Sequence, residues 1–251
     1  MLKRIVKRPL LSLLAWLLLV SFYLSVCLNI AFYKQVVQDL PLDSLRNILV
    51  FLSMPVVAFS VMNIVLTLAS FLWLNRLLAC LFILMSASAQ YFIMTYGIII
   101  DRSMIANMVD TTPAETFALM TPRMVLTLGL SGIAAAIVAC WIKIKPTTPV
   151  LRSVLYRAAN VLVSVLLIVL VAAFFYKDYA SLFRNNKELV KALSPSNGIV
   201  ASWSWYSHQR LAHLPLVRIG EDAHRNPVMQ QEKRKNLTIL IVGETSRGEN
   251  Y

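Results

Sequence analysis

Charged residues are scarce in this 251-residue sequence, and acidic residues are the scarcest, with 12 Asp and Glu against 24 Lys and Arg. Only 14% of the residues are charged and 58% are hydrophobic, whereas soluble domains carry about 25% charged and about 45–50% apolar residues. In a soluble chain, the formal charge of +12 would indicate a nucleic-acid partner. In a chain this hydrophobic it indicates a membrane protein, so we expect no nucleic-acid partner.

Cysteine is also rare, and its placement excludes two further classes of protein. The three cysteines, Cys27, Cys80 and Cys140, all lie inside apolar runs. No pair lies in an aqueous segment, where a disulfide framework or a CxxC metal site would form. The composition therefore excludes a disulfide scaffold, a zinc finger and an intrinsically disordered tail.

Long uncharged runs, by contrast, are abundant. A bilayer core about 30 Å thick requires about 20 residues of helix, and five runs approach this length. We therefore predict an all-α polytopic membrane domain with five transmembrane helices over residues 1–176. The predicted spans cover residues 9–33, 47–75, 77–100, 124–142 and 158–176. The first begins like a signal peptide, but it is too long and lacks a cleavage pattern, so we expect it to remain uncleaved.

Two expectations about packing follow from these runs. Only a tight connection at Asn75 and Arg76 separates the second run from the third, which predicts an antiparallel helical hairpin. Gly129 and Gly132 in the fourth run are expected to permit close helix contact in lipid.

The distribution of charge predicts the orientation of the spans. If the N-terminus is cytoplasmic, the inside connections hold nine basic residues and no acidic ones, whereas the outside loops hold four basic and five acidic residues. Basic residues near span ends are retained in the cytoplasm. We therefore expect a multi-pass protein of a bacterial inner membrane, with a cytoplasmic N-terminus and a periplasmic segment after residue 176. The nine basic residues are Lys3, Arg4, Lys7, Arg8, Arg76, Lys143, Lys145, Arg152 and Arg157.

Residues 177–235 are expected to form interfacial helices and a linker. The sequence SLFRNNKELVKAL predicts a short amphipathic helix that ends at Ser194-Pro195. Next, Trp203, Trp205 and Tyr206 favour a helix in the lipid headgroup layer. Residues 236–251 contain the short aliphatic run LTILIV, which is typical of a buried parallel strand. We therefore predict that the chain ends at the truncated start of an α/β domain.

Two groups of residues are candidates for chemistry. Glu244 follows the predicted strand, where a carboxylate can bind a divalent cation, although the segment from Thr245 to Glu249 equally fits a helix cap. Asn107, Thr111 and Glu115 are spaced four and four, so a continuous helix would present an amide, a hydroxyl and a carboxylate on one face, suited to an ammonium group.

Pro113 leaves a second interpretation of this loop open, in which a new helix starts with Thr111 or Thr112 as its cap and Glu115 in its first turn. The histidines favour a solvated or interfacial role over metal binding, because they lie in the linker without ligand spacing. They are His208, His213 and His224.

The whole chain resembles the lipid A phosphoethanolamine transferases of Gram-negative inner membranes, a group that includes the mobile colistin-resistance enzymes. The resemblance rests on the five spans, the ANMVDTTPAET loop, the FRNNKELVKALSPSNGIVASWSWY bridge and the NLTILIVGETSR strand. It implies that the final strand begins a sulfatase-like or alkaline-phosphatase-like catalytic domain. Glu244 matches a ligand of the catalytic zinc ion, and Asn107, Thr111 and Glu115 match loop residues implicated in binding the headgroup of the phosphatidylethanolamine donor.

The resemblance also implies the reaction. A threonine attacks the donor phosphorus, diacylglycerol leaves, and a lipid A phosphate then takes the phosphoethanolamine, which lowers the negative surface charge and weakens binding of cationic polymyxins. The family's threonine nucleophile and other zinc ligands match no position in these 251 residues, so the fragment itself is expected to be inactive. Two alternatives remain open: another lipopolysaccharide sugar or a glucan as acceptor, or a non-enzymatic five-span scaffold or sensor in contact with membrane lipids.

Overall fold

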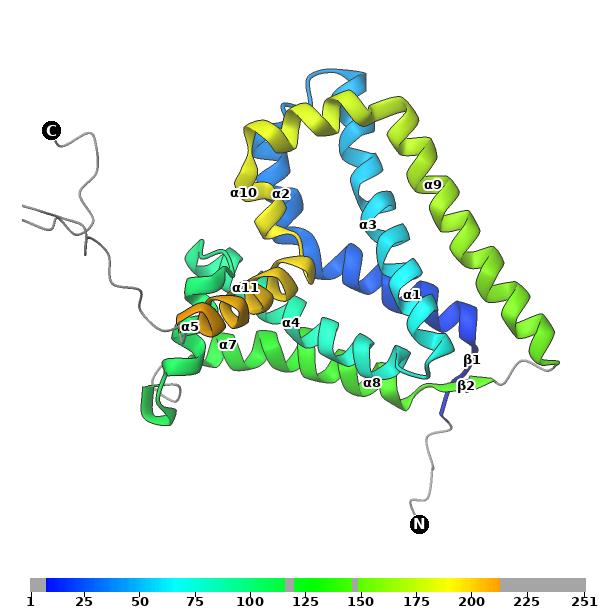
Figure 1. Cartoon of the computed structure of the whole chain (residues 1–251), viewed down its shortest axis with the longest axis horizontal. Coiled ribbons are helices and arrows are strands. Elements are labelled where there is room, and N and C mark those ends of the chain that lie inside the picture. The colour runs from blue at the N-terminus through cyan, green and yellow to red at the C-terminus, as the bar shows by residue number, and fades with distance from the viewer. Residues whose placement is uncertain (1–7, 116–119, 146–148, 213–251) are drawn as a thin grey trace, which may run out of the picture. The chain divides into compact units, whose positions relative to one another are not determined.

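A computed structural model describes residues 8–115, 120–145 and 149–212 of the chain, almost all of them helical (Figure 1). The first half contains α1 (Leu13–Ser25), η1 (Cys27–Asn29), α2 (Ile30–Asp39), α3 (Leu45–Phe71), α4 (Asn75–Tyr96) and α5 (Arg102–Asp110). The second half contains α7 (Pro122–Thr127), η2 (Leu128–Ala134), α8 (Ala135–Trp141), α9 (Val150–Asn185), α10 (Lys187–Ala192) and α11 (Ser196–Ala212). Two three-residue strands, β1 (Leu10–Ser12) and β2 (Lys143–Lys145), pair in parallel.

The five predicted spans are confirmed, because five helical segments in the described residues are long and apolar enough to cross a membrane. Their bounds are Leu13–Asp39, Leu45–Phe71, Asn75–Tyr96, Pro122–Trp141 and Val150–Asn185. The fifth differs most from its predicted bounds of 158–176, since α9 continues without a break over 36 residues. The first begins later than predicted, because residues 10–12 are extended and Ser12 caps α1 through the backbone N–H of Ala15.

The first span bends between α1 and α2, where η1 interrupts the α-helical ladder. Backbone groups freed inside a bilayer must find internal partners. At this bend Gln90 of α4 supplies two of them: its Oε1 accepts from the backbone N–H of Ile30 at 2.8 Å, and its Nε2 donates to the carbonyl of Cys27 at 3.1 Å. Asn29 Nδ2 donates to the carbonyl of Leu24 at 2.8 Å. The bend is therefore stabilised by polar side chains that the hydrophobic pattern does not reveal.

One group of spans, α1, α4 and α8, packs mainly through apolar side chains and small residues. Trp16 and Ile83 are buried in its core together with four alanines, Ala79, Ala87, Ala136 and Ala139. Gly132, in the π-helical segment η2, lies so close to α4 that a Cβ there would stand 3.3 Å from the Cβ of Ala87. Small residues of this kind allow helix backbones to approach closely in lipid.

The expectation for the two glycines is therefore half correct. Gly132 makes the predicted close contact, whereas a Cβ on Gly129 would have no neighbour within 4 Å. The π-helical segment places the two residues on different sides of the helix surface, so only one meets α4.

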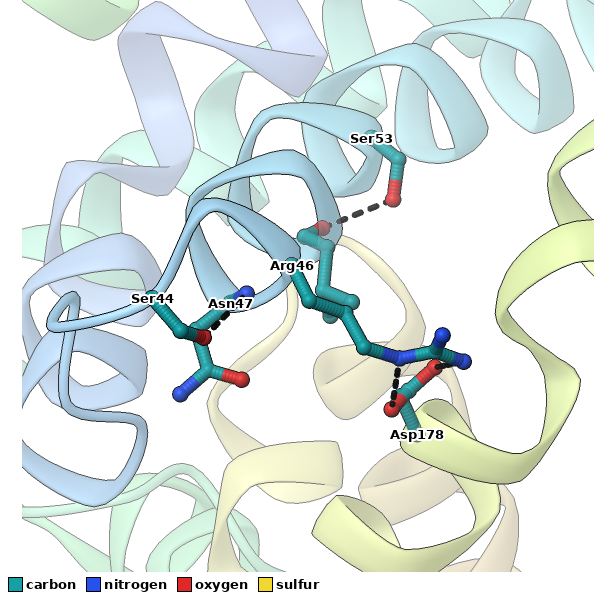
Figure 2. A network of polar contacts seen from close by, with 6 residues as sticks. Ser44, Arg46, Asn47, Ser53 and Asp178 are labelled. Atoms are coloured by element: carbon teal, nitrogen blue, oxygen red, sulfur yellow. Dashed lines mark hydrogen bonds and ion pairs between the residues drawn. The ribbon is translucent and has the colours of Figure 1, made fainter.

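A second pair of spans, α3 and α9, packs together and is joined by polar contacts along its length. Near the start of α3, Arg46 makes a two-point ion pair with Asp178, with Nε and Nη2 at 3.1 and 2.9 Å from the carboxylate oxygens (Figure 2). Figure 2 also shows Ser44 capping α3 through the N–H of Asn47. Further along α3, the hydroxyl of Ser53 lies 2.8 Å from that of Tyr179.

Deeper in the same pair, two asparagine side chains exchange hydrogen bonds. Asn63 and Asn160 each donate to the other's Oδ1 at 3.1 Å. The remaining amide protons reach Ser164 Oγ at 2.9 Å and Thr67 Oγ1 at 2.9 Å. Asn63 is only 1% exposed, so this network satisfies polar groups that neither water nor lipid can reach.

The second and third runs are joined by a short turn, as the predicted hairpin requires, but the two helices pack mainly against other helices. Three residues, 72–74, join α3 to α4, and Asn75 and Arg76 already belong to α4. Trp73 takes a left-handed backbone conformation in this turn, with φ of 61°. Beyond it the two helices diverge, and α4 lies along η2 and α8 while α3 lies along α9 (Figure 1).

The segment after the last span differs from the single amphipathic helix predicted over residues 181–193. The chain leaves helical geometry at Asn186, which ends α9 and precedes the short α10. The helical region does stop before the cis Ser194-Pro195 bond, as predicted. Asn29 accepts from the backbone N–H of Ser194 at 2.8 Å and donates to its carbonyl at 2.9 Å. These two hydrogen bonds, called the clasp below, join the segment just before α11 to the bend of the first span.

Candidate functional site

The loop that contains the three predicted donor-binding residues starts with α5. Asp101 caps this helix by accepting from the backbone N–H of Met104 at 2.9 Å and from Ser103 Oγ at 2.6 Å. The hydrogen bond from Ser103 is the main reason that the pKa of the Asp101 carboxyl lies below its usual value. The residue therefore remains a carboxylate at neutral pH.

Of the two interpretations that the sequence leaves open for this loop, the one with Asn107, Thr111 and Glu115 on one continuous helical face does not hold. Helix α5 ends at Asp110, and Thr111 has an extended backbone. A residue shortly before a proline is biased away from helical geometry, and Pro113 follows two positions later. Asn107 and Thr111 stay together, because the Thr111 hydroxyl and backbone N–H both donate to the carbonyl of Asn107.

The structure shows the other interpretation of this loop. Thr112 is the helix cap, and Glu115 lies in the first turn that follows it. The backbone N–H of Thr112 donates to Glu115 Oε2 at 2.9 Å, and the N–H of Glu115 donates to Thr112 Oγ1 at 3.4 Å. This reciprocal arrangement is a capping box. The hydrogen bond from the Thr112 backbone lowers the pKa of the Glu115 carboxyl. The carboxylate is exposed and ionised, and it keeps accepting capacity for a second partner such as an ammonium group.

A cavity of about 450 Å³ lies at the other end of α5, against α10 and α11. Asp101 brings a negative charge to its lining, Arg102 and Lys191 bring positive charges, and Asn197 brings an amide. The Lys191 ammonium also pairs with Glu188 at 2.6 Å. The Asn197 side chain is buried, its Oδ1 accepts from the Gly198 N–H at 2.7 Å, and its Nδ2 has no partner among the described residues. A carboxylate, an ammonium and a free amide donor together suit a small zwitterion.

The sequence gives no signal for this cavity, since its walls come from segments about 90 residues apart. None of the three predicted donor-binding residues lines it. The nearest available clue is the SPSNG sequence, whose turn residues place Asn197 at the start of α11.

The helix predicted around Trp203, Trp205 and Tyr206 is present as α11 and carries exposed aromatic residues. Trp203 and Tyr206 are in ring contact at 6.1 Å, and the guanidinium of Arg210 lies 6.0 Å from the Tyr206 ring. His208 is exposed on the same helix, in agreement with a solvated role. His213, His224 and the predicted metal ligand Glu244 lie outside the described residues.

Comparison with known proteins adds to this geometry. A family model described as phosphoethanolamine transferase EptA/EptB matches residues 58–210. The chain is 82% identical over its whole length to phosphoethanolamine transferase EptA of Escherichia coli, of which it covers 46%. It is 26% identical, over 92% of its length, to phosphatidylethanolamine transferase Mcr-1 of Escherichia coli, of which it covers 43%.

A solved structure is similar as well. The integral membrane protein lipooligosaccharide phosphoethanolamine transferase A (EptA) from Neisseria meningitidis superposes with a TM-score of 0.76 at 32% identity, over 83% of this chain and 39% of that one. The chain therefore spans about half the length, or less, of the relatives that it matches.

Proposed function

Because the chain belongs to the phosphoethanolamine transferase EptA/EptB family, we propose that it is the membrane part of an enzyme that transfers phosphoethanolamine from phosphatidylethanolamine to a lipid A phosphate. The similarity to EptA along the entire chain carries this proposal. The name of the solved relative, which includes lipooligosaccharide, supports a lipid-anchored sugar as acceptor. Adding an ammonium group to lipid A lowers its negative charge, which weakens attraction of cationic peptides such as polymyxins.

The arrangement of the spans suits a reaction between two lipids. Donor and acceptor both reside in the membrane, so an enzyme anchored by five spans meets them at its surface. Helix α11, with its exposed aromatic side chains, suits the headgroup layer at that surface. The basic residues of the connections favour an inner-membrane protein with a cytoplasmic N-terminus and a periplasmic bridge.

For the donor headgroup, the loop offers two groups that suit different parts of it. The exposed Glu115 carboxylate suits the ammonium, and it is held in place by the capping box with Thr112. The exposed Asn107 amide can donate to a phosphate oxygen, while the hydroxyl proton of Thr111 is already used on the Asn107 carbonyl. We expect Thr111 to act by fixing the end of α5 next to the headgroup.

The proposed cofactor is a zinc ion, with Glu244 as one ligand. The support is the VGETSR motif, because carboxylate oxygens are ordinary zinc ligands. When bound, zinc supplies a Lewis acid that lowers the pKa of a hydroxyl nucleophile. No group of three or more His, Cys, Asp or Glu side chains in the described residues is arranged to hold a metal ion.

Expressing this chain in bacteria, extended by the C-terminal part of its EptA relative, tests the transferase proposal. We expect mass spectrometry to find phosphoethanolamine on lipid A, and Glu244→Ala to abolish the modification while membrane insertion stays unchanged. Unmodified lipid A, with the protein abundant in the membrane, would contradict the proposal. Modification of another lipopolysaccharide sugar or a glucan instead would replace only the acceptor.

Donor binding is tested in the same extended protein with Glu115→Gln. This substitution removes the charge that pairs with the ammonium, and we expect the KM for phosphatidylethanolamine to rise about tenfold with zinc content unchanged. Asp101→Asn is the matched control, because Asp101 caps the other end of α5. If Asp101→Asn raises the KM and Glu115→Gln does not, the headgroup binds in the α5–α10–α11 cavity instead.

A further inference from the structure

A second cavity, of about 680 Å³, lies where α3 ends and where α4 and α9 begin. Three basic side chains line it, Arg76, Lys145 and Arg157, and none of the lining residues is acidic. We call it the basic cavity. It lies at the end of the spans that also holds β1 and β2 (Figure 1), far along the chain from the candidate donor loop.

The two arginines of the basic cavity are held by backbone carbonyls and not by carboxylates. Arg157 Nη1 donates to the carbonyl of Ser70 at 3.1 Å, and its guanidinium lies 4.9 Å from the centre of the Phe71 ring. Arg76 Nη2 donates to the carbonyl of Ile142 at 2.9 Å. These contacts fix the side chains at the ends of α3 and α8 but leave their positive charges without a counter-ion among the described residues.

One nitrogen atom of the Arg157 side chain lacks a hydrogen-bond partner among the described residues. Arg157 Nε is buried, and no hydrogen-bond acceptor meets it among the described residues. An anion in the cavity would supply the counter-charge that Arg76, Lys145 and Arg157 lack among the described residues. The geometry therefore calls for a ligand with a phosphate-like anion.

The other walls of the basic cavity are apolar. They include Leu13, Val150 and Val154 from the first turns of α1 and α9. Trp73, which also lines the cavity, is 89% exposed, and Val150 is 76% exposed. Tryptophan is enriched where membrane meets water. A free phosphate ion would leave these apolar walls uncovered, whereas a lipid would cover them with its acyl chains.

We propose that the basic cavity binds the phosphodiester of an anionic glycerophospholipid from the leaflet at this end of the spans. A headgroup with net negative charge, such as phosphatidylglycerol, is favoured over zwitterionic phosphatidylethanolamine, because no lining carboxylate can pair with an ammonium group. The lipid would join the ends of α3 and α8 to the start of α9. This site is separate from any donor site and does not depend on the transferase activity.

Native mass spectrometry of the full chain in detergent tests the proposal by titration with phosphatidylglycerol or phosphatidylethanolamine. We expect phosphatidylglycerol to bind about tenfold more tightly, and Arg157→Gln to remove that preference. Arg152→Gln is the matched control on the same helix: Arg152 contacts Tyr156 and does not line the cavity.

Because Arg157 also holds the end of α3, Lys145→Gln provides a second variant whose exposed side chain makes no such contact. We expect it to weaken phosphatidylglycerol binding about threefold while thermal unfolding without lipid stays unchanged. Equal binding of the two lipids, or a preference that survives both substitutions, would overturn the proposal. Full displacement of the lipid by millimolar inorganic phosphate would also overturn it, because the site would then belong to a free anion.

Discussion

The two groups of spans associate by different means, although their sequences are similarly hydrophobic. Helices α3 and α9 are joined by an ion pair near one end, a hydroxyl pair further along and an asparagine network deeper in. Helices α1, α4 and α8 bring alanines and a glycine into close contact. The polar side chains of Trp16 and Tyr23 between them donate to backbone carbonyls and not to other side chains. Lipid tails are as apolar as leucine, so neither group can rely on the hydrophobic effect.

The difference shows that hydrophobicity alone decides which segments enter the membrane but not which segments pair. Which helices pair depends on a few residues that add little to the hydropathy of a span, such as Asn63, Asn160 and Gly132. In α3 and α9 these residues form hydrogen bonds, and in α4 and η2 they remove bulk. Substitutions at the two kinds of contact should therefore lower the free energy of unfolding by different amounts. At one kind they introduce a steric clash, and at the other they remove a hydrogen bond.

The largest effect is expected from Gly132→Leu. A Cβ at this position already stands 3.3 Å from Ala87 and 3.6 Å from Leu84, so a larger side chain forces α4 and η2 apart. We expect a loss of about 3 kcal/mol in the free energy of unfolding, measured by circular dichroism in detergent mixtures containing increasing dodecyl sulfate. Gly129→Leu is the control and should cost little, because its Cβ meets no neighbour. Equal losses for the two variants would show that close contact is not what joins these helices.

A smaller effect is expected from Asn63→Ala in α3. The substitution leaves the Asn160 amide and the Ser164 hydroxyl short of a partner, and we expect a loss of about 1–2 kcal/mol in the same assay. A double-mutant cycle with Asn160→Ala isolates the pair, and the coupling energy should be about 0.6 kcal/mol or more. Additive effects of the two substitutions would remove the asparagine network from the forces that join α3 to α9.

The smallest effect is expected from Arg46→Gln, despite the two-point geometry of its ion pair with Asp178 in Figure 2. The Arg46 side chain is 61% exposed, and exposed ion pairs contribute about 0.2–1 kcal/mol. We expect a loss below about 0.5 kcal/mol that shrinks further in high salt. A loss larger than that of Asn63→Ala would mean that the ion pair at the end of α3 and α9 contributes more to their association than the asparagine network in the middle.

The sequence was sufficient to predict the number of spans, because length and lack of charge report directly on the bilayer. It could not predict the bend between α1 and α2, since that bend depends on Gln90 from another helix. It also underestimated α9, because charged residues such as Arg157 and Asp178 were taken to lie beyond the span, and the helix continues through both.

The candidate site was predicted less well than the spans. The four-residue spacing of Asn107, Thr111 and Glu115 suggested one helical face, but a local hydrogen-bond exchange between Thr112 and Glu115 determines the backbone there. This capping box is the second interpretation that Pro113 left open in the sequence. The role of Glu244 rests on its motif alone.

The clasp between Asn29 and Ser194 has a mechanical consequence for the bridge. Two hydrogen bonds to the Ser194 backbone, at 2.8 and 2.9 Å, fix the start of the bridge at the point where the first span bends. The bridge therefore cannot tilt as a free tether, because lifting α11 away would first pull on that bend. Helix α11 is therefore anchored to the first span by these two bonds as well as to α5 by its own packing.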